Sequence, residues 1–245
     1  MDSATTQRAA TLLAVILVLA FGCALLYSRL SADGYETQRQ RMVDTQLKGP
    51  DRDIRDQRVL TAMAKVPRHE FVPPEYKDMA YADSPLPIGH GQTISQPFIV
   101  AKMTELLKPG KNDVCLEIGT GSGYQAAVLA ELVKQVYTIE IIEALGKPVK
   151  ERLKRLGYTN IEVKIADGYD GWPEHGPYDG IVVTCAANHV PPPLVQQLKK
   201  GGRMAIPVGG PFSLQNLMLV EKDKNGNLSQ RTIFPVSFVP MVGGH

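Results

Sequence analysis

Three glycines in five positions give this chain its clearest chemical signal. Residues 116–124 read LEIGTGSGY, so that Gly119, Gly121 and Gly123 closely follow an apolar run. Glycine reaches positive φ and lets another molecule come close to the backbone, although it loses much conformational freedom on folding. When such a loop joins a strand to a helix, backbone N–H groups face a ligand at the start of the helix. The spacing therefore predicts a ligand site at this loop.

Three classes of ligand compete for a loop of this kind. A phosphate-binding P-loop requires GxxxxGK[ST], and this loop contains no Lys-Ser or Lys-Thr pair. A dinucleotide site has GxGxxG, whereas this loop has GxGxG. The class that remains is S-adenosylmethionine, whose methionine end carries a carboxylate and an amine but no pyrophosphate. We expect the loop N–H groups to hold the carboxylate, and Glu117 to hold the amine or to brace the loop.

Two later acids support a nucleoside ligand. Glu140 ends the second predicted strand about 20 residues after the loop opens, where an acid accepts hydrogen bonds from ribose hydroxyls. Asp167, followed by Gly168, closes the third strand. Ligands of open α/β sheets bind beyond the carboxyl ends of the strands. We therefore expect Glu117, Glu140 and Asp167 to meet at one edge of a sheet.

Alternating strands and helices along the second half of the chain would position these side chains. Strands are predicted at 114–118, 136–140, 161–165, 181–184 and 204–208, and helices at 123–132, 145–156 and 191–199. This order is typical of βαβ units around a mainly parallel sheet. Further on, Asn225-Gly226 separates two apolar runs and predicts a hairpin. The predicted fold is α/β, with an antiparallel pair at the C-terminal end of the sheet.

The region before the sheet combines helices with a long loop. Residues 36–65 place apolar side chains at helical spacing and predict two short amphipathic helices, broken at Gly49-Pro50. Residues 66–94 hold too many prolines and glycines for a helix, and predict an ordered functional loop. A helix is predicted next, with Ser95 as its N-cap and its end at Pro109-Gly110.

The composition gives no sign of a nucleic-acid partner or of a metal site. The net charge is +2, which gives no reason to expect a nucleic-acid partner. The three cysteines form neither a CxxC pair nor a Cys/His cluster, so that we expect no metal site. Cys115 and Cys185 lie in apolar runs and are predicted to be buried thiols.

An apolar segment precedes the domain. Residues 9–27 form an uncharged run of 19 residues, close to the roughly 20 that span a bilayer as a helix. We therefore divide the chain into a segment 1–34, with a transmembrane or signal helix, and a folded domain 35–245. More arginines follow the run than precede it, so that the domain is expected on the cytoplasmic side of the inner membrane. The alternatives are a cleaved signal peptide, which would export the domain, and a buried core helix.

Six runs between residues 42 and 243 match one family in their order and their residues. They are VPRHEFVP (66–73), LPIGHGQTISQPFIVAKMTELL (86–107), CLEIGTGSGYQAAVLAEL (115–132), DGYDGWPEHGPYDGIVVTCAA (167–187), QLKKGGRMAIPVG (197–209) and VSFVPMVG (236–243). In these runs the chain resembles protein-L-isoaspartate O-methyltransferase, which methylates aged, isomerised aspartyl residues. The pair GTGSGYQAA and GQTISQP is highly specific to that family. The departures are Cys115 in place of a common valine, Ala166 in place of a frequent glycine, and the segment 9–27, which most members lack.

The resemblance implies a seven-stranded, Rossmann-like methyltransferase sheet with S-adenosylmethionine as the cofactor. It assigns Ser95 as the active-site residue beside the substrate carboxylate. The implied cofactor contacts are Glu117, Gly119, Thr120, Gly121, Gly123, Glu140, Asp167, Gly168 and Thr184. The implied substrate contacts are Thr93, Ile94, Gln96 and Val239, from the loop 86–96 and the tail 236–243.

The implied activity is methylation of the free carboxylate of L-isoaspartyl residues in damaged proteins and peptides, as protein repair by a monomer. The ester formed closes to a succinimide, which allows partial return to normal aspartate. Two alternatives stay open: a carboxyl methyltransferase for one dedicated peptide, and a non-catalytic, membrane-tethered binding module of the same fold. Retention of Ser95, the glycine loop and the three acids argues against the binding module.

Overall fold

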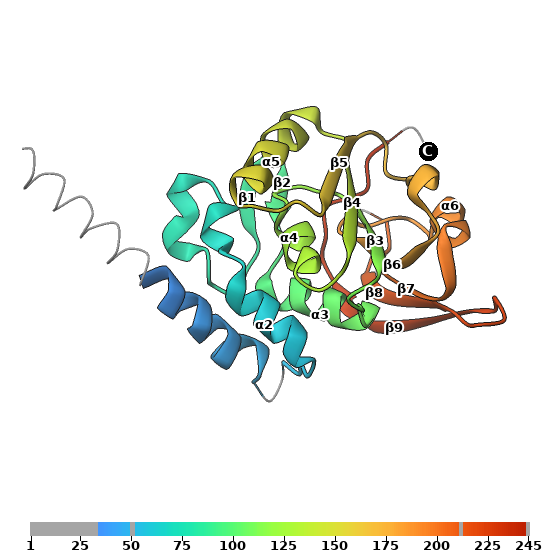
Figure 1. Ribbon diagram of the computed structural model, residues 1–245, viewed down its shortest axis with the longest axis horizontal. Coiled ribbons are helices and arrows are strands. Elements are labelled where there is room, and N and C mark those ends of the chain that lie inside the picture. The colour runs from blue at the N-terminus through green and yellow to red at the C-terminus, as the bar shows by residue number, and fades with distance from the viewer. Residues whose placement is uncertain (1–33, 50–51, 211–212, 244–245) are drawn as a thin grey trace, which may run out of the picture.

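A seven-stranded sheet organises the protein (Figure 1). The computed structural model describes residues 34–49, 52–210 and 213–243, so that the predicted membrane helix 9–27 lies outside the described residues. Within those residues, no helix is long and apolar enough to cross a membrane. The strands of the sheet are β3 (Val114–Ile118), β4 (Gln135–Glu140), β5 (Ile161–Ile165), β6 (Tyr178–Val183), β7 (Leu198–Val208), β8 (Gln215–Lys222) and β9 (Leu228–Val236).

The strand order places a crevice in the middle of the sheet. Across the sheet the order is β5-β4-β3-β6-β7-β8-β9, with parallel pairing from β5 to β7 and antiparallel pairing from β7 to β9. The chain moves outward in one direction from β3 and in the other direction from β6. Such a reversal leaves a ligand crevice at the carboxyl ends of the two strands. The predicted parallel sheet with a C-terminal hairpin is confirmed.

Alternate residues of each strand point to opposite faces of the sheet. Leu116 and Ile118 of β3 join one buried cluster, which includes Leu194 of α6 (Pro192–Gln196) and Trp172. Cys115 joins the other cluster, which includes residues of the helices α2 to α5. By the same alternation Glu117 faces the side of the sheet that α4 covers.

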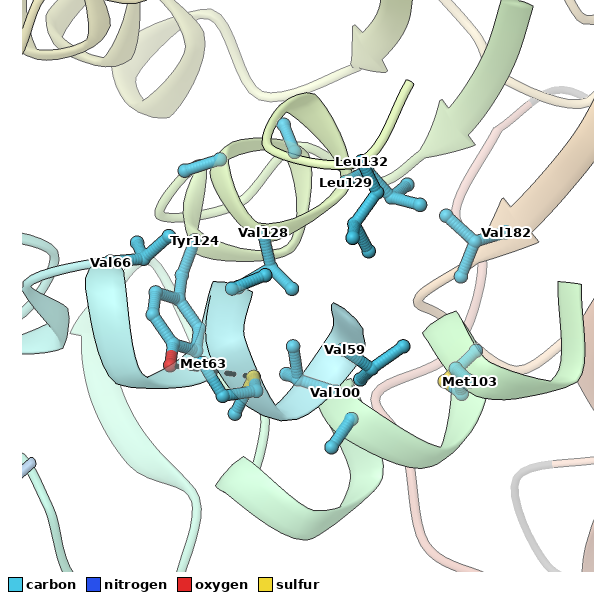
Figure 2. Packing of buried hydrophobic residues seen from close by; sticks show 14 of the residues in the cluster. Val59, Met63, Val66, Val100, Met103, Tyr124, Val128, Leu129, Leu132 and Val182 are labelled. Carbon is cyan, nitrogen blue, oxygen red and sulfur yellow. Dashed lines mark hydrogen bonds between the residues drawn. The ribbon is translucent and has the colours of Figure 1, made fainter. Parts of the chain in front are cut away.

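The helices on that side fix two segments relative to each other. They are α2 (Gln57–Lys65), α3 (Pro97–Leu107), α4 (Tyr124–Ala130) and α5 (Glu143–Arg155). Figure 2 shows apolar side chains of α2, α3 and α4 packed together, and the Tyr124 hydroxyl donates a hydrogen bond to Met63 Sδ at 3.8 Å. Because α3 follows Ser95 and α4 follows the glycine loop, this packing holds those two segments in place.

The N-terminal helices agree with the sequence prediction. Residues 34–42 are helical and continue through a π-helical turn at Val43–Leu47, and α2 follows. Their apolar stripe, with Met42, Leu47 and Met63 fully buried, packs into the cluster beneath α3 and α4. The two amphipathic helices predicted in this region are therefore confirmed.

The proline-rich stretch 66–94 is ordered, as predicted, and it contains a hairpin that the sequence did not predict. Short 3₁₀ helices at Arg68–Glu70 and Pro74–Met79 precede the paired strands β1 (Leu86–Gly89) and β2 (Gln92–Ile94). Arg68 is fully buried, donates from Nε to the carbonyl of Ala80 at 2.7 Å, and places its guanidinium 4.9 Å from the centre of the Tyr124 ring.

The prediction that Ser95 caps the following helix is wrong. The helix α3 begins at Pro97, and Gln96 is the residue that precedes its first turn. Neither the Ser95 nor the Gln96 side chain accepts a hydrogen bond from the first turn. The Asp83 carboxylate takes this role instead and accepts from the N–H of Phe98 at 3.2 Å. A cap supplied by a residue 15 positions away replaces the local cap that the sequence favoured.

Candidate active site

A cavity opens at the carboxyl ends of β3 and β6, beneath the hairpin β1–β2 and the C-terminal tail. Most of the residues predicted to bind a cofactor line it. They are Glu117, Gly119, Thr120, Gly121, Glu140, Gly168 and Thr184. Thr93, Ile94, Ser95 and Val239 also reach its wall. The structure thus brings the predicted cofactor residues and the predicted catalytic serine to one place.

Two of the predicted cofactor residues do not line the cavity. Gly123 faces α5, since a Cβ at this position would lie 2.8 Å from Val149 Cγ1. Its lack of a side chain therefore serves the packing of α5 against the start of α4. Asp167 lies beside the cavity rather than on its wall, and its Oδ1 accepts from the N–H of Tyr169 at 3.0 Å.

Glu117 is a fully buried carboxyl with one unpartnered oxygen. Its Oε2 accepts a hydrogen bond from the Thr138 hydroxyl at 2.5 Å, and that hydroxyl is 2.7 Å from the hydroxyl of Thr120. Its Oε1 has no partner among the described residues. Burial raises the pKa of Glu117 to about 8, although the hydrogen bond from Thr138 opposes that shift. A cationic group placed beside it would lower this pKa again, because a nearby positive charge favours the ionised carboxylate.

Gln125 is a second acceptor, which the sequence analysis missed. It lines the same cavity, donates from Nε2 to the Thr104 hydroxyl at 2.9 Å, and leaves Oε1 buried without a partner among the described residues. The available signal was a lone polar residue in the otherwise apolar helix YQAAVLA. Buried polar atoms are normally hydrogen-bonded, so that two free acceptors in one cavity indicate a donor-rich ligand group.

Three N–H groups at the start of the glycine loop are already engaged, contrary to the expectation that the loop N–H groups hold an anion. Those of Gly119 and Thr120 donate to the carbonyl of Ile139, at 2.9 and 3.1 Å. That of Gly121 donates to Glu140 Oε2 at 2.7 Å. Glu140 Oε1 accepts from the N–H of Ile142 at 2.9 Å, so that this acid braces the loop.

Gly119→Ala is expected to cost more stability than Gly157→Ala. Both glycines have positive φ, +92° and +84°, but a Cβ at Gly119 would lie 2.6 Å from Thr184 Oγ1, whereas a Cβ at Gly157 meets nothing within 4 Å. We expect a loss of about 1 kcal/mol at Gly157, from backbone strain alone, and about 3 kcal/mol at Gly119. Urea unfolding of both variants measures the difference. Equal losses would contradict the close approach of Thr184.

A second cavity adjoins the first and shares part of its wall. Thr93, Ser95, Thr184 and Val239 line both. The second also has Gln96, Pro85, Ile99 and residues 235–238 on its wall. The Thr184 hydroxyl is engaged with the carbonyls of Gly119 and Ile118, at 2.6 and 3.0 Å. The Ser95 hydroxyl has no hydrogen-bond partner among the described residues, so that it is free to donate at the junction.

The C-terminal tail is held at both cavities by hydrogen bonds to its backbone, from the Gln215 side chain and from the backbone of Ala186. Gln215 accepts from the N–H of Phe238 at 2.6 Å and donates to its carbonyl at 3.1 Å. Ala186 donates to the carbonyl of Val239 at 2.8 Å and accepts from the N–H of Met241 at 2.7 Å. These contacts bring residues 239–242 to the cavity wall, as the predicted role of the tail requires.

The two cysteines differ in their surroundings. Cys115 is fully buried in β3, as predicted, while Cys185 lies just after β6, is partly exposed and lines the first cavity. Burial raises the pKa of Cys185 to about 12, so that its thiol is neutral at physiological pH. In the described part of the chain, no group of three or more His, Cys, Asp or Glu side chains could hold a metal ion.

Comparison with known proteins identifies the family. The model of the family "Protein-L-isoaspartate(D-aspartate) O-methyltransferase (PCMT)" matches residues 38–245. The chain belongs to this family. It is 65% identical to protein-L-isoaspartate O-methyltransferase 2 of Syntrophobacter fumaroxidans over 190 residues, which cover 78% of this chain and 77% of that protein. It is 58% identical to protein-L-isoaspartate O-methyltransferase 1 of Nitrosospira multiformis over 225 residues, which cover 92% and 94%.

Solved structures of the family share the fold. A protein-L-isoaspartate O-methyltransferase superposes with a TM-score of 0.76 at 31% identity, over 84% of this chain and 66% of that one. A putative family member from Plasmodium falciparum, solved with S-adenosyl-L-homocysteine, gives a TM-score of 0.69 at 27% identity, over 83% and 98%. Family membership makes this protein an S-adenosylmethionine-dependent methyltransferase that acts on isoaspartyl residues in protein repair.

The cavity fits the cofactor of the family. The methionine end of S-adenosylmethionine carries an ammonium group with three N–H donors. Glu117 Oε1 and Gln125 Oε1 are buried acceptors without a partner among the described residues, and both side chains line the cavity. Unpartnered acceptors on the wall of the cavity suit a charged donor, because hydrogen bonds to charged groups are the strong ones.

The protein without cofactor is expected to lose stability as the pH rises from about 4.5 to about 8. Glu117 has a raised pKa in the folded state, so that within this window the folded protein keeps a proton that the unfolded chain has lost. Raising the pH therefore favours unfolding, by at most about 1.4 kcal/mol per pH unit from this group.

Urea unfolding at a series of pH values, with Glu117→Gln as the comparison, measures this effect. The variant cannot ionise at this position, so that the difference in unfolding free energy between the two proteins isolates Glu117. A difference that stays constant between pH 5 and 8 would contradict a buried neutral carboxyl.

Proposed function

We propose that the protein methylates the free carboxylate of L-isoaspartyl residues in many damaged proteins, and that Ser95 orients this carboxylate. The observation that carries the proposal is the Ser95 hydroxyl, which has no partner among the described residues and lies where the cofactor cavity meets the second cavity. The second cavity, lined by Thr93, Gln96 and Val239, is where the peptide binds.

The chemistry requires little acid–base assistance from the protein. A carboxyl group with a pKa of about 4 is ionised at pH 7 and is already nucleophilic. When bound, S-adenosylmethionine supplies a methyl group that its sulfonium has activated. The task of the chain is therefore to hold the carboxylate in line, and such positioning contributes roughly 7–11 kcal/mol. Ser95 donates one hydrogen bond to the carboxylate, which aims it without transferring a proton to it.

Several residues hold the cofactor in this proposal. Glu117 and Gln125 accept from the ammonium group, since both residues line the cavity and each has a buried oxygen without a partner among the described residues. Glu140 accepts from ribose hydroxyls through the remaining lone pairs of its oxygens, each of which already accepts one backbone N–H. Ile94 and the backbone at Gly119, Thr120, Gly121 and Gly168 shape the wall. Asp167 and Gly123 have supporting roles beside it.

A repair enzyme must accept isoaspartyl residues in many sequences, which separates it from an enzyme for one dedicated peptide. The test is kcat/KM for several unrelated isoaspartyl peptides of equal length. Values within about tenfold of one another support the repair function, since a tenfold change corresponds to only about 1.4 kcal/mol. Turnover of a single peptide in the set would favour the dedicated enzyme. Cofactor binding without turnover of any peptide would favour the binding module.

We further propose that segment 1–34 tethers the domain 35–245 to the inner membrane, with the domain in the cytoplasm and the protein monomeric. The family match begins only at residue 38, so that segment 1–34 precedes it. The match to the protein-L-isoaspartate O-methyltransferase of Opitutus terrae covers 94% of this chain, and it therefore includes part of residues 9–27. S-adenosylmethionine is made in the cytosol, which favours this orientation. An alkaline phosphatase fusion after residue 35 should be inactive; an active fusion would contradict it.

A further inference from the structure

We propose that Asp83 is a positioning residue that acts on turnover through Ser95. This inference rests on the proposed role of Ser95. The Asp83 carboxylate makes three contacts. Two are with Phe98 and Gln96, which follow Ser95 in the chain, and the third is with Arg52, which lies over the Phe98 ring. Its Oδ1 accepts from the N–H of Phe98 at 3.2 Å, and its Oδ2 accepts from Gln96 Nε2 at 2.8 Å and from Arg52 Nη1 at 3.0 Å.

The start of α3 depends on this carboxylate. Pro97 is the first helical residue and has no N–H, so that Phe98 presents the first N–H of the helix that needs an acceptor. Gln96 makes no capping hydrogen bond, since its side chain is turned to Asp83 instead. Without Asp83, the first turn loses its only side-chain acceptor among the described residues and Gln96 loses its partner.

Ser95 is held from both sides. On its N-terminal side, Ile94 is buried and pairs with Leu86 in the hairpin β1–β2. On its C-terminal side, the next residue is Gln96, whose amide is fixed by Asp83. Ser95 itself makes no side-chain hydrogen bond to the described residues, so that its neighbours alone set its direction. Loss of the Gln96 contact would release one of these two constraints.

Arg52 connects Asp83 with the wall of the second cavity. Its guanidinium pairs with Asp83 and lies 4.5 Å from the centre of the Phe98 ring. Phe98 stacks on Phe234 of β9 with ring centres 6.0 Å apart, directly before Pro235 of the cavity wall. Asp83 lines neither cavity, so that it reaches the reaction through these neighbours and not by touching a ligand.

Asp56 offers a matched control. It caps α2 by accepting from the N–H of Arg58 at 2.9 Å and forms an ion pair with the same arginine at 2.7 Å. Its side chain is 22% exposed, against 17% for Asp83. Asp56 lines neither cavity. Both aspartates thus combine a cap with an ion pair at similar exposure, but only Asp83 contacts the residue after Ser95.

The test is a double-mutant cycle on the full chain. Asp83→Ala and Asp56→Ala are made alone and together with Ser95→Ala, and kcat for an isoaspartyl peptide, cofactor affinity and thermal midpoint are measured. We expect similar falls in midpoint for the two aspartate variants. Asp83→Ala is expected to lower kcat about tenfold in the wild-type background and less than about twofold in the Ser95→Ala background, since coupled residues are not additive. Asp56→Ala should leave kcat unchanged in both backgrounds.

Each other outcome has a distinct meaning. A tenfold loss that persists in the Ser95→Ala background, or an unchanged kcat for Asp83→Ala, would overturn the role of Asp83. An unchanged kcat for Ser95→Ala alone would instead refute the proposed role of Ser95. If Asp83→Ala does not fold, Asp83→Asn keeps one acceptor oxygen and loses the ion pair. That variant is expected to show the same dependence on Ser95 with a smaller loss, and a wild-type kcat for it would overturn the inference.

Discussion

Ser95→Ala is expected to lower kcat for an isoaspartyl peptide by about 10- to 100-fold, while the dissociation constant of S-adenosylmethionine changes less than about twofold. The expected loss corresponds to about 1.5–3 kcal/mol, the usual contribution of a hydrogen bond to a charged group. The cofactor is spared because Glu117 and Gln125, which hold its ammonium group in our proposal, belong to other elements. Steady-state kinetics and calorimetric titration of the cofactor measure the two effects.

A conservative variant provides the control for this prediction. Ser95→Thr keeps the hydroxyl, so that it should recover most of the kcat that Ser95→Ala loses. Because Ser95 is not the cap of α3, removal of its hydroxyl should also leave the thermal midpoint nearly unchanged. An unchanged kcat for Ser95→Ala, or an equal loss in both variants, would contradict the donated hydrogen bond.

Glu117→Gln is expected to weaken S-adenosylmethionine binding by about 10- to 100-fold. Glutamine keeps the size of the side chain and an oxygen that can accept from the Thr138 hydroxyl. It removes the negative charge and turns an amide N–H₂, instead of a free oxygen, toward the ammonium group. The loss of a buried, charge-assisted hydrogen bond corresponds to about 1.5–3 kcal/mol. Calorimetric titration of the variant measures the change.

The same titration with 5′-methylthioadenosine tests where the effect arises. This compound has the nucleoside but no amino-acid end, so that Glu117→Gln should leave its affinity within about twofold of the wild type. Equal losses for both compounds would place the contribution of Glu117 in the shape of the glycine loop rather than at the ammonium group.

Local patterns predicted most of the fold. The strands β3 and β5 begin and end at the residues that the apolar runs indicated, because a buried parallel strand is a continuous apolar run. The turn Asp223–Asn227 between β8 and β9 follows the Asn-Gly signal. Both features depend on neighbours in the chain, which is why the sequence alone was sufficient for them.

Contacts between distant residues explain what the sequence did not predict. Asp83 caps α3 from 15 residues away, and Gln125 bonds Thr104 from 21 residues away. The residues next to Ser95 and those of α4 do not indicate that Asp83 and Thr104 are the partners. Asp167 follows its strand as predicted, but the chain turns so that Gly168, and not the carboxylate, reaches the cavity.

The glycine loop lies at the cavity, as its motif predicted, but the contacts predicted for its N–H groups are wrong. Its N–H groups were expected to hold an anion, yet those of Gly119, Thr120 and Gly121 bind Ile139 and Glu140. The pattern of glycines predicts a close backbone approach, but it does not reveal which acceptors fold back onto the loop. The two unpartnered acceptors in the cavity are therefore a more direct guide to the ligand than the glycines.

One measurement tests the central claim most directly. The full chain is supplied with S-adenosylmethionine labelled in its methyl group and with two peptides that differ only in one residue, aspartate or isoaspartate. We predict transfer of label to the isoaspartyl peptide, as a base-labile ester, and none to its aspartyl counterpart. Equal labelling of both peptides, or none of either by a protein that still binds the cofactor, would contradict the account.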